Sequence, residues 1–150
     1  MVQTLVSLLV HMVFSTENRS NTIKSEVEPE LHAYMGGVLK DKWCRALTVN
    51  GTANHVHLLV SMTKNLPLSS VVGELKKSSS KWIKTKGGQF RGFDWQDGYG
   101  AFSIGQSGVE ALKEYIANQK ERHKRQSFDA EFVQLLRKYG IEYNEEYLWG

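Results

Sequence analysis

The chain has 150 residues, of which 41% are hydrophobic and 23% charged, so it can bury a core and does not have the composition of a disordered or membrane-spanning protein. The formal net charge of +3 is too small to identify a partner, and the only cysteine, Cys44, excludes an internal disulfide framework and a cysteine-built zinc site. The apolar stretch LVSLLVHMVF is too short to cross a bilayer and has no features of a signal peptide. We therefore expect one cytoplasmic domain over residues 1–150, without membrane association.

The first half of the chain predicts a strand, a helix and a hairpin. Residues 5–16 are rich in β-branched and large apolar side chains, which is typical of a buried strand. From Ile23 to about Trp43 apolar residues recur at helical spacing, with Pro29 near the first turn. The segments CRALTV and TANHVHLLVSM then flank Asn50-Gly51, a strong signal for a type I′ hairpin turn.

The second half predicts three helices and one more strand. An apolar stripe indicates a helix from about Pro67 to Lys84, and a glycine-rich aromatic connection leads to the short strand AFSIG. The sequence Ser107-Gly108-Val109-Glu110 fits a capping box that starts a helix through about Arg122. A final helix covers roughly Ala130 to Lys138, followed by an aromatic, acidic tail.

The order β-α-β-β-α-β-α-α predicts an α+β fold. It fits a ferredoxin-like or RRM-like antiparallel sheet with helices on one face, in a single domain without internal repeats. The other face of the sheet would then be free for a ligand.

Two histidines lie one residue apart in the strand NHVHLLV. Side chains alternate along a strand, so His55 and His57 face one side while Val56, Leu58 and Val60 face the other. Two imidazoles on one surface can bind a divalent cation, but a metal site needs further ligands. Taken alone, the pattern is more often a pair of hydrogen-bonded or surface histidines.

Tyr115 and Gln119 are four residues apart, which places them on one side of the predicted helix. Gln119 could supply a third metal ligand, while Tyr115 presents its hydroxyl to a group that the metal polarises. A structural tyrosine is the more common case, because Tyr115 borders the apolar stripe of this helix. Five other tyrosines lack a ligand-type neighbour at helical spacing: Tyr34, Tyr99, Tyr139, Tyr143 and Tyr147.

Basic residues cluster in two places, between Leu75 and Phe93 and again after Tyr115, and the first of these segments contains no acidic residue. Such clusters favour a polyanionic partner, although solvated helix faces are equally common. The candidate DNA contacts are Lys76, Lys77, Lys81, Arg91, Lys120 and Arg122. Phe90 and Phe93 could contact unpaired bases or belong to the core, and the core is the more common place; Trp82 and Trp95 are expected to pack.

The joint pattern resembles the HUH single-tyrosine transposases of the small insertion sequences, including their repeat-associated branch. The histidine pair on a strand and the later Tyr-x-x-x-Gln carry the resemblance, which extends over nearly the whole chain through HMVFSTENR, NHVHLLV, LKKSSSKWI, WQDGYGAFSI, YIANQ and EFVQLLRKYGIEY. Asn54 stands where many members of that family carry aspartate, which leaves the ligand residues intact.

The resemblance implies cleavage and rejoining of single-stranded DNA through a covalent 5′-phosphotyrosine, with Tyr115 as the nucleophile. His55, His57 and Gln119 would then hold Mg²⁺ or Mn²⁺, although this ligand set alone would also suit zinc. Such a site has no anionic protein ligand, and no base is obvious beside Tyr115. The resemblance also implies hairpin-bearing substrates and a homodimer in which the tyrosine helix of one subunit completes the histidine pair of the other.

Two other functions remain open from the residues alone. An RRM-like module would bind single-stranded nucleic acid without cutting it, as a domesticated regulator could, and predicts stacking aromatic residues where this sheet carries histidines. A metal-dependent nuclease would use water and form no covalent adduct. Replacement of Tyr115 by phenylalanine distinguishes both from the transposase.

Overall fold

A computed structural model describes residues 2–149 of the chain. Four strands and five α-helices follow one another as β1 (Leu9–Ser15), α1 (Glu28–Asp41), β2 (Arg45–Thr52), β3 (His55–Ser61), α2 (Leu68–Lys84), β4 (Gly100–Ile104), α3 (Val109–Ala117), α4 (Gln119–Arg122) and α5 (Phe128–Lys138). Three short 3-10 turns lie at Glu17–Arg19, Gly88–Phe90 and Gln106–Gly108. Within residues 2–149, no helix is both long and apolar enough to span a membrane.

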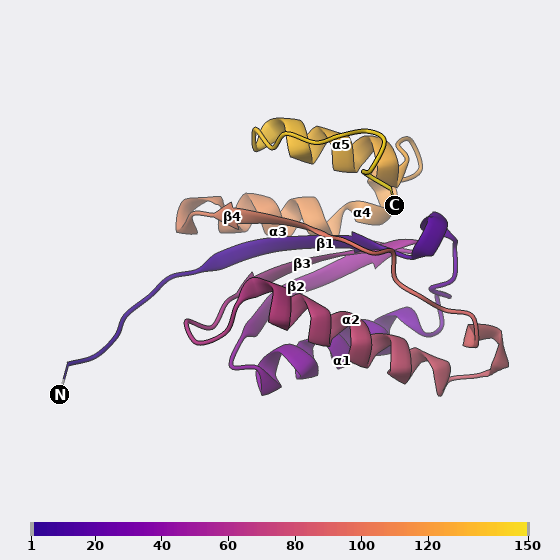
Figure 1. The fold of residues 1–150 in the computed structure, drawn as a ribbon, viewed down its shortest axis with the longest axis horizontal. Helices are drawn as coiled ribbons and strands as arrows, with labels where there is room; N and C mark the ends of the chain where they lie inside the picture. The colour runs from indigo at the N-terminus through magenta and orange to yellow at the C-terminus, as the bar shows by residue number, and fades with distance from the viewer. Residues whose placement is uncertain (1, 150) are drawn as a thin grey trace.

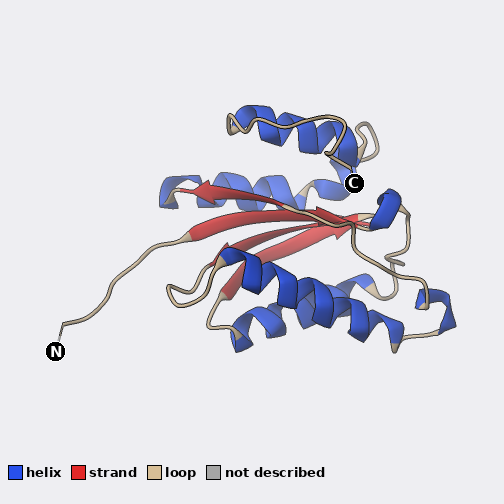
Figure 2. Ribbon diagram, viewed as in Figure 1, coloured by secondary structure: helices blue, strands red, loops and turns tan. Residues whose placement is uncertain are grey.

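The four strands form one antiparallel sheet in the order β2-β3-β1-β4 (Figures 1 and 2). The two central strands, β1 and β3, pair along their whole length, with Val13 opposite His57 and Ser15 opposite His55. This is the predicted ferredoxin-like order, and the α+β fold class is confirmed. Because β3 is a central strand, both histidines lie in the interior of the sheet and not on an edge strand. Along β3 they lie close to its first residue.

Helices α1 and α2 cover one face of the sheet, as predicted, and enclose the largest core together with Val56, Leu58 and Val60 of β3. The opposite face is not free. Figure 1 shows α3, α4 and α5 on that side, where two smaller apolar clusters form around Val13 and Leu59. The residues of the central strands are almost all buried on both faces, although one face carries His11, His55 and His57, and strands buried in this way are usually covered on both sides.

The hairpin between β2 and β3 is confirmed, but its turn lies at Ala53-Asn54. Asn50 pairs with His57 and Gly51 with Val56 inside the ladder. Asn50 donates from its side-chain amide to the carbonyl of Ile116 at 2.9 Å, near the end of α3. The asparagine that looks like a turn residue therefore connects β2 to a helix on the covered face.

Gly51 lies in a position where a side chain would collide with backbone. A Cβ there would be 2.1 Å from the carbonyl oxygen of His55 and 2.9 Å from the Cα of Val56. We expect Gly51→Ala to lower the free energy of unfolding by about 1–3 kcal/mol, measured by urea denaturation. Gly73→Ala on α2 is the matched control: its Cβ would meet nothing within 4 Å, so it should raise stability by roughly 0.5–1 kcal/mol. Equal effects of the two changes would contradict this assignment.

The predicted capping box at Ser107 is wrong. Ser107 lies in the 3-10 turn before α3, whose N-cap is Gly108 without a side-chain capping bond. A side-chain cap occurs instead at α5, where the backbone N–H of Ala130 donates to Ser127 Oγ at 3.1 Å, so this helix begins at Phe128. The helix predicted through Arg122 is divided at Asn118, which has non-helical φ and ψ of −94° and 16°.

Candidate active site

His55 and His57 are fully buried and face α3–α5, as the alternation on β3 predicts. The Nδ1 atom of His55 lies 2.8 Å from Asn54 Oδ1 and 2.9 Å from Thr52 Oγ1, both in or beside the hairpin turn. These contacts direct the Nε2 atom of His55 toward Gln119, whose Oε1 is 2.9 Å away. The hairpin thus orients the imidazole of His55 toward the first residue of α4.

A third histidine, His11 on β1, orients the second imidazole. His11 Nε2 lies 2.8 Å from His57 Nδ1, and their rings are stacked with centroids 5.0 Å apart. Burial, reinforced by the nearby His57, lowers the pKa of His11 to about 3, and burial likewise lowers the pKa of His55 to about 3. Both rings are therefore neutral at physiological pH, and neutral imidazole is the form that binds metal ions.

The centre of the site is Glu131 on α5, a residue that the sequence analysis did not single out. Only 1% of its surface is exposed. Its Oε1 lies 3.1 Å from His57 Nε2 and 2.9 Å from His123 Nε2, and its Oε2 accepts a hydrogen bond from Gln119 Nε2 at 2.8 Å and another from the Tyr115 hydroxyl. Burial alone would raise the pKa of Glu131, but its hydrogen bonds with His123 and His57 hold that pKa well below the ordinary value. Glu131 is therefore an anionic carboxylate.

Tyr115 and Gln119 come together as predicted, although a helix break separates them. Both side chains contact the same carboxylate oxygen of Glu131, and the ring centroid of Tyr115 lies 5.8 Å from that of His57. Burial, and then the hydrogen bond to Glu131, raise the pKa of Tyr115 above its usual value, so the phenol is protonated. The guanidinium of Arg122 lies 4.5 Å from the centre of the tyrosine ring.

The structure corrects two expectations about this site. A site without an anionic group was expected, but a carboxylate lies beside both histidines. No base was obvious near Tyr115, but its hydroxyl donates directly to Glu131. All of these contacts, including the ring contact between Tyr115 and His57, occur within one chain.

The side chains present at the site are suited to a divalent cation. One nitrogen each from His55 and His57 and one carboxylate oxygen of Glu131 all lie within 4.8 Å of one another, and the three residues are buried. The amide oxygen of Gln119 lies 2.9 Å from His55 Nε2. Imidazole nitrogens combined with carboxylate and amide oxygens suit Mn²⁺, Zn²⁺ and similar ions, and oxygen ligands also suit Mg²⁺. Glu131 thus places an anionic group beside the predicted ligand set.

Because His11 Nε2 contacts His57 Nδ1, we expect His11→Leu to weaken metal binding. If His57 bound a metal ion through Nε2, its proton would lie on Nδ1 and would need an acceptor there, which His11 Nε2 supplies. Loss of such an outer partner lowers metal affinity by about 10- to 100-fold, measurable by calorimetric titration of Mn²⁺. His11→Gln, which keeps an acceptor, should recover part of the affinity; equal affinities of wild type and His11→Leu would contradict the role.

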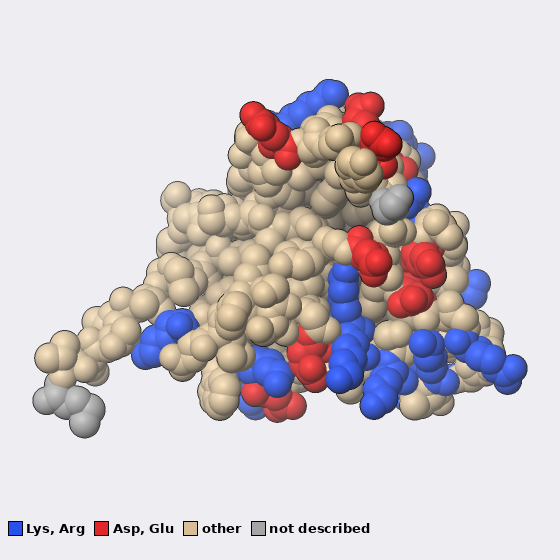
Figure 3. Space-filling model, viewed as in Figure 1, with Lys and Arg blue, Asp and Glu red and all other residues tan. Residues whose placement is uncertain are grey.

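The predicted DNA-contact lysines of α2 differ in their surroundings. Lys77 and Lys81 are exposed and, with Lys84, line a groove that also contains Asp94 and Asp97. Figure 3 shows lysine and arginine side chains gathered over this region of the molecule, with acidic side chains beside them.

Lys76 is half-buried instead and donates to the carbonyls of Gln96, at 2.7 Å, and Gly98. Burial lowers the pKa of Lys76. These contacts fasten α2 to the loop before β4, so Lys76 has a structural role in the protein without DNA.

Of the remaining candidates, Lys120 and Arg122 belong to α4, the helix that begins with Gln119. Lys120 donates to the carboxylate of Glu28 and to Asn50 Oδ1 at 3.0 Å, whereas Arg122 lies over Tyr115. Arg91 is exposed. The aromatic residues near Arg91 pack inside the protein, which was the more common alternative. Phe90, Phe93 and Trp95 are buried, and Trp82 stacks on Tyr34.

Comparison with known proteins identifies the family. Residues 4–119 match the family described as Transposase IS200 like, and the chain belongs to that family. A proposed transposase from Deinococcus radiodurans R1 has a similar fold, with 19% sequence identity, a TM-score of 0.62, and coverage of 79% of this chain and 95% of that chain. A REP-associated tyrosine transposase bound to a REP hairpin is 14% identical, with a TM-score of 0.62 and coverage of 82% and 73%. No curated protein sequence matches the chain.

Proposed function

We propose that the protein is a single-stranded DNA transposase, acting as one domain over residues 1–150, that cleaves and rejoins DNA through a covalent 5′-phosphotyrosine on Tyr115. One observation carries the proposal: three separate elements, β3, α3 and α5, bring the His55–His57 pair, the Tyr115 hydroxyl and the Glu131 carboxylate into one network of contacts. The family membership supports transposition as the process. The central strands present histidines at this face, which does not favour an RRM-like stacking surface.

His55, His57 and Glu131 would hold a divalent cation, Mg²⁺ or Mn²⁺, with Gln119 as a further ligand. When bound, the cation supplies positive charge beside the scissile phosphate. Because Glu131 contributes a negative charge, less of the cation's charge is left for the phosphate than a neutral ligand set would leave. Gln119 also fixes the carboxylate through its amide N–H, so it positions Glu131 whether or not it binds the ion.

Tyr115 performs the nucleophilic step. Its oxygen forms a bond to the scissile phosphorus, the bond from phosphorus to the 3′ oxygen breaks, and that oxygen takes up a proton to become a free 3′-hydroxyl. The phenol must lose its proton during attack, and Glu131 Oε2 is the acceptor that already receives its hydrogen bond. Arg122, over the ring, stabilises the phenolate as it develops. Attack by another 3′-hydroxyl reverses these bond changes and joins the strands without ATP.

The partner is single-stranded DNA, and we include hairpins in the substrate because one of the structural relatives is bound to a REP hairpin. Exposed Lys77, Lys81 and Arg91 are free to meet phosphates directly. Lys76, Lys120 and Arg122 would contact DNA only by sharing or exchanging the partners they already have. DNA binding by these residues should weaken with salt, as counterion release requires.

A homodimer would provide the two nucleophiles that excision of a segment requires. Residues 2–8 support this assembly, because they precede β1 as an extended segment (Figure 1) and leave Val2, Leu5 and Val6 exposed by 94%, 83% and 54%. We expect deletion of residues 2–6 to shift the protein from dimer to monomer in light scattering at micromolar concentration. A deletion that leaves the mass in solution unchanged would place the dimer contact elsewhere.

The function is tested with single-stranded oligonucleotides from the flanks of the protein's own gene. Incubation with Mg²⁺ or Mn²⁺, followed by a denaturing gel, should show a protein–DNA adduct that disappears when the metal is chelated. Cleavage without an adduct would indicate water as the nucleophile and overturn the proposal. Binding without cleavage by folded, metal-loaded protein on every flanking strand would favour the binding module.

A further inference from the structure

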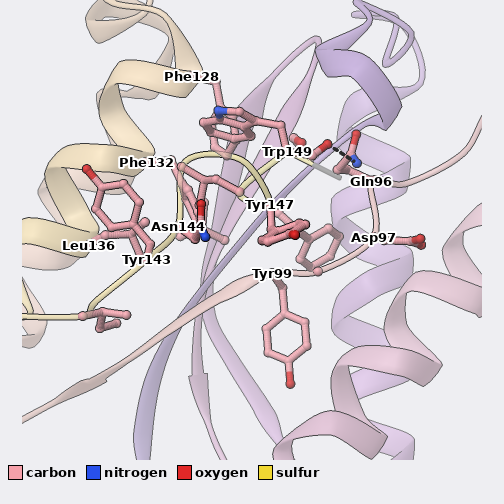
Figure 4. A pocket seen from close by; sticks show the side chains of 16 residues that line it. Gln96, Asp97, Tyr99, Phe128, Phe132, Leu136, Tyr143, Asn144, Tyr147 and Trp149 are labelled. Atoms are coloured by element: carbon pink, nitrogen blue, oxygen red, sulfur yellow. Dashed lines mark hydrogen bonds between the residues drawn. The ribbon is translucent and has the colours of Figure 1, made fainter.

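A cavity of about 340 Å³ lies beside the active site, between α5, the C-terminal segment 141–149 and the loop 96–99 (Figure 4). Its walls are largely aromatic: Phe128 and Phe132 come from α5, and Tyr147 and Trp149 come from the C-terminal segment. Its polar lining includes Gln96, Asp97 and Asn144. The family match ends at residue 119, so most of these walls lie in the part of the chain outside it.

The ring of Phe128 separates this cavity from the histidines. The ring centroid of Phe128 lies 4.5 Å from that of His55, on one side, and 6.4 Å from that of Trp149, on the other. Phe132 lies 5.6 Å from Phe128 and 5.8 Å from Trp149, so three rings form a continuous aromatic corner. The ring of Phe128 would therefore lie between a group in the cavity and the imidazole of His55.

We propose that this cavity binds one unstacked base of the single-stranded DNA, next to the phosphate that Tyr115 attacks; the inference rests on the proposed function. Aromatic faces stack on any base, whereas side-chain amides and carboxylates hydrogen-bond to base edges. The cavity lies near the lower end of the usual size of ligand pockets, about 300–1,000 Å³, which suits a single base better than a duplex.

The position of charged groups supports a nucleotide as the occupant. The guanidinium carbon of Arg19 lies 4.9 Å from the ring centre of Trp149, and Arg19 Nε pairs with Asp129 at 3.1 Å. Arg19 Nη1 is buried and has no hydrogen-bond partner among the residues that the structure describes. A phosphate attached to the bound nucleotide would supply an acceptor for that group.

The cavity also adjoins the lysine groove on α2. Gln96 and Asp97 line both, and Lys77, Lys81 and Lys84 lie along the groove. Gln96 is itself held in place, because its side-chain amide donates to the carbonyl of Trp149 at 2.8 Å while its Oε1 accepts from the N–H of Asn18 at 3.0 Å. A strand whose phosphates follow the lysines can therefore turn one base into the aromatic cavity and continue to Tyr115.

The test replaces single bases of the DNA and leaves the phosphates intact. Tyr115→Phe protein, loaded with Mn²⁺, is titrated by fluorescence anisotropy with flanking strands that carry one abasic site at successive positions around the cleavage point. We expect one position to raise Kd by about 5- to 100-fold, the usual effect of losing one stacked base, and its neighbours to have much smaller effects. A flat profile over all positions would overturn the proposal.

Protein variants then assign the sensitive position to the cavity. Trp149→Ala should raise Kd for intact DNA by a similar factor and cause no further loss with the abasic strand, because both changes remove the same contact. Tyr147→Ala, at a residue that is 73% exposed, is a second variant and should also raise Kd for intact DNA, and circular dichroism checks that both variants are folded. Trp43→Ala is the matched control, since Trp43 lies between α1 and β2 and is 72% exposed.

The outcomes separate this proposal from the transposase function. In one outcome, wild-type protein forms the Tyr115 adduct, but the abasic site raises Kd by the same factor in Trp149→Ala as in the wild type. The cavity proposal then fails, and the transposase function stands. If the abasic effect vanishes in Trp149→Ala and persists in Trp43→Ala, the cavity binds the base, even if no adduct forms and the nuclease or binding-module function replaces the transposase.

Discussion

Replacement of Tyr115 by phenylalanine is expected to abolish the covalent protein–DNA adduct completely. The change removes one oxygen, the atom that we propose bonds to phosphorus, and keeps the ring that lies against Arg122 and near His57. No other phenol of the structure contacts Glu131. Adduct formation is measured by denaturing gel, and Kd for the uncleaved strand should change by less than about threefold, since an aromatic ring of the same size remains.

The matched control is Tyr34→Phe, because Tyr34 stacks on Trp82 on the other face of the sheet, with ring centroids 5.1 Å apart. This variant should form the adduct at the wild-type rate. An adduct of normal yield in Tyr115→Phe would show that another residue is the nucleophile, and equal loss in both variants would indicate a general effect on folding.

Replacement of Glu131 by glutamine is expected to slow adduct formation by about 10²- to 10⁴-fold, the range over which a general base contributes. Glutamine has nearly the same shape, but it lacks the negative charge that we propose accepts the Tyr115 proton and that lies beside both histidines. The rate is measured in a single turnover, with enzyme in excess over DNA.

Two further measurements distinguish the roles of Glu131. Mn²⁺ affinity should fall in Glu131→Gln if the carboxylate is a ligand, whereas Kd for DNA should stay within a fewfold of wild type. Glu114→Gln, an exposed neighbour of Tyr115 on α3, is the control and should have no effect on either quantity. Wild-type rates in Glu131→Gln would contradict both roles of the carboxylate.

Much of the fold could be predicted because its signals are local. The alternation along β3 placed His55 and His57 on one face, and the four-residue spacing brought Tyr115 and Gln119 together even though α3 ends between them. The turn was misplaced because Asn50 and Gly51 have roles that only tertiary structure reveals: one donates to α3, and the other leaves room for the backbone of β3.

The rest of the site depends on the packing of α5 across the sheet. Glu131 looks like an ordinary helix acid in sequence, and only its position on the apolar stripe of α5, next to Phe128, Phe132 and Leu135, marks it as buried. His123 similarly lies among basic residues that look like a solvated surface. Local periodicity does not say which helix covers the histidines, so a carboxylate from the far end of the chain could not be assigned to them.

The most direct test of the central claim is to map the attachment site. Wild-type protein is allowed to react with a flanking strand in Mn²⁺, the DNA and the protein are digested, and the peptides are sequenced by mass spectrometry. We expect a nucleotide joined through its 5′-phosphate to Tyr115 and to no other tyrosine. Attachment at a different residue, such as Tyr99 or Tyr147, would contradict the assignment of this network as the active site.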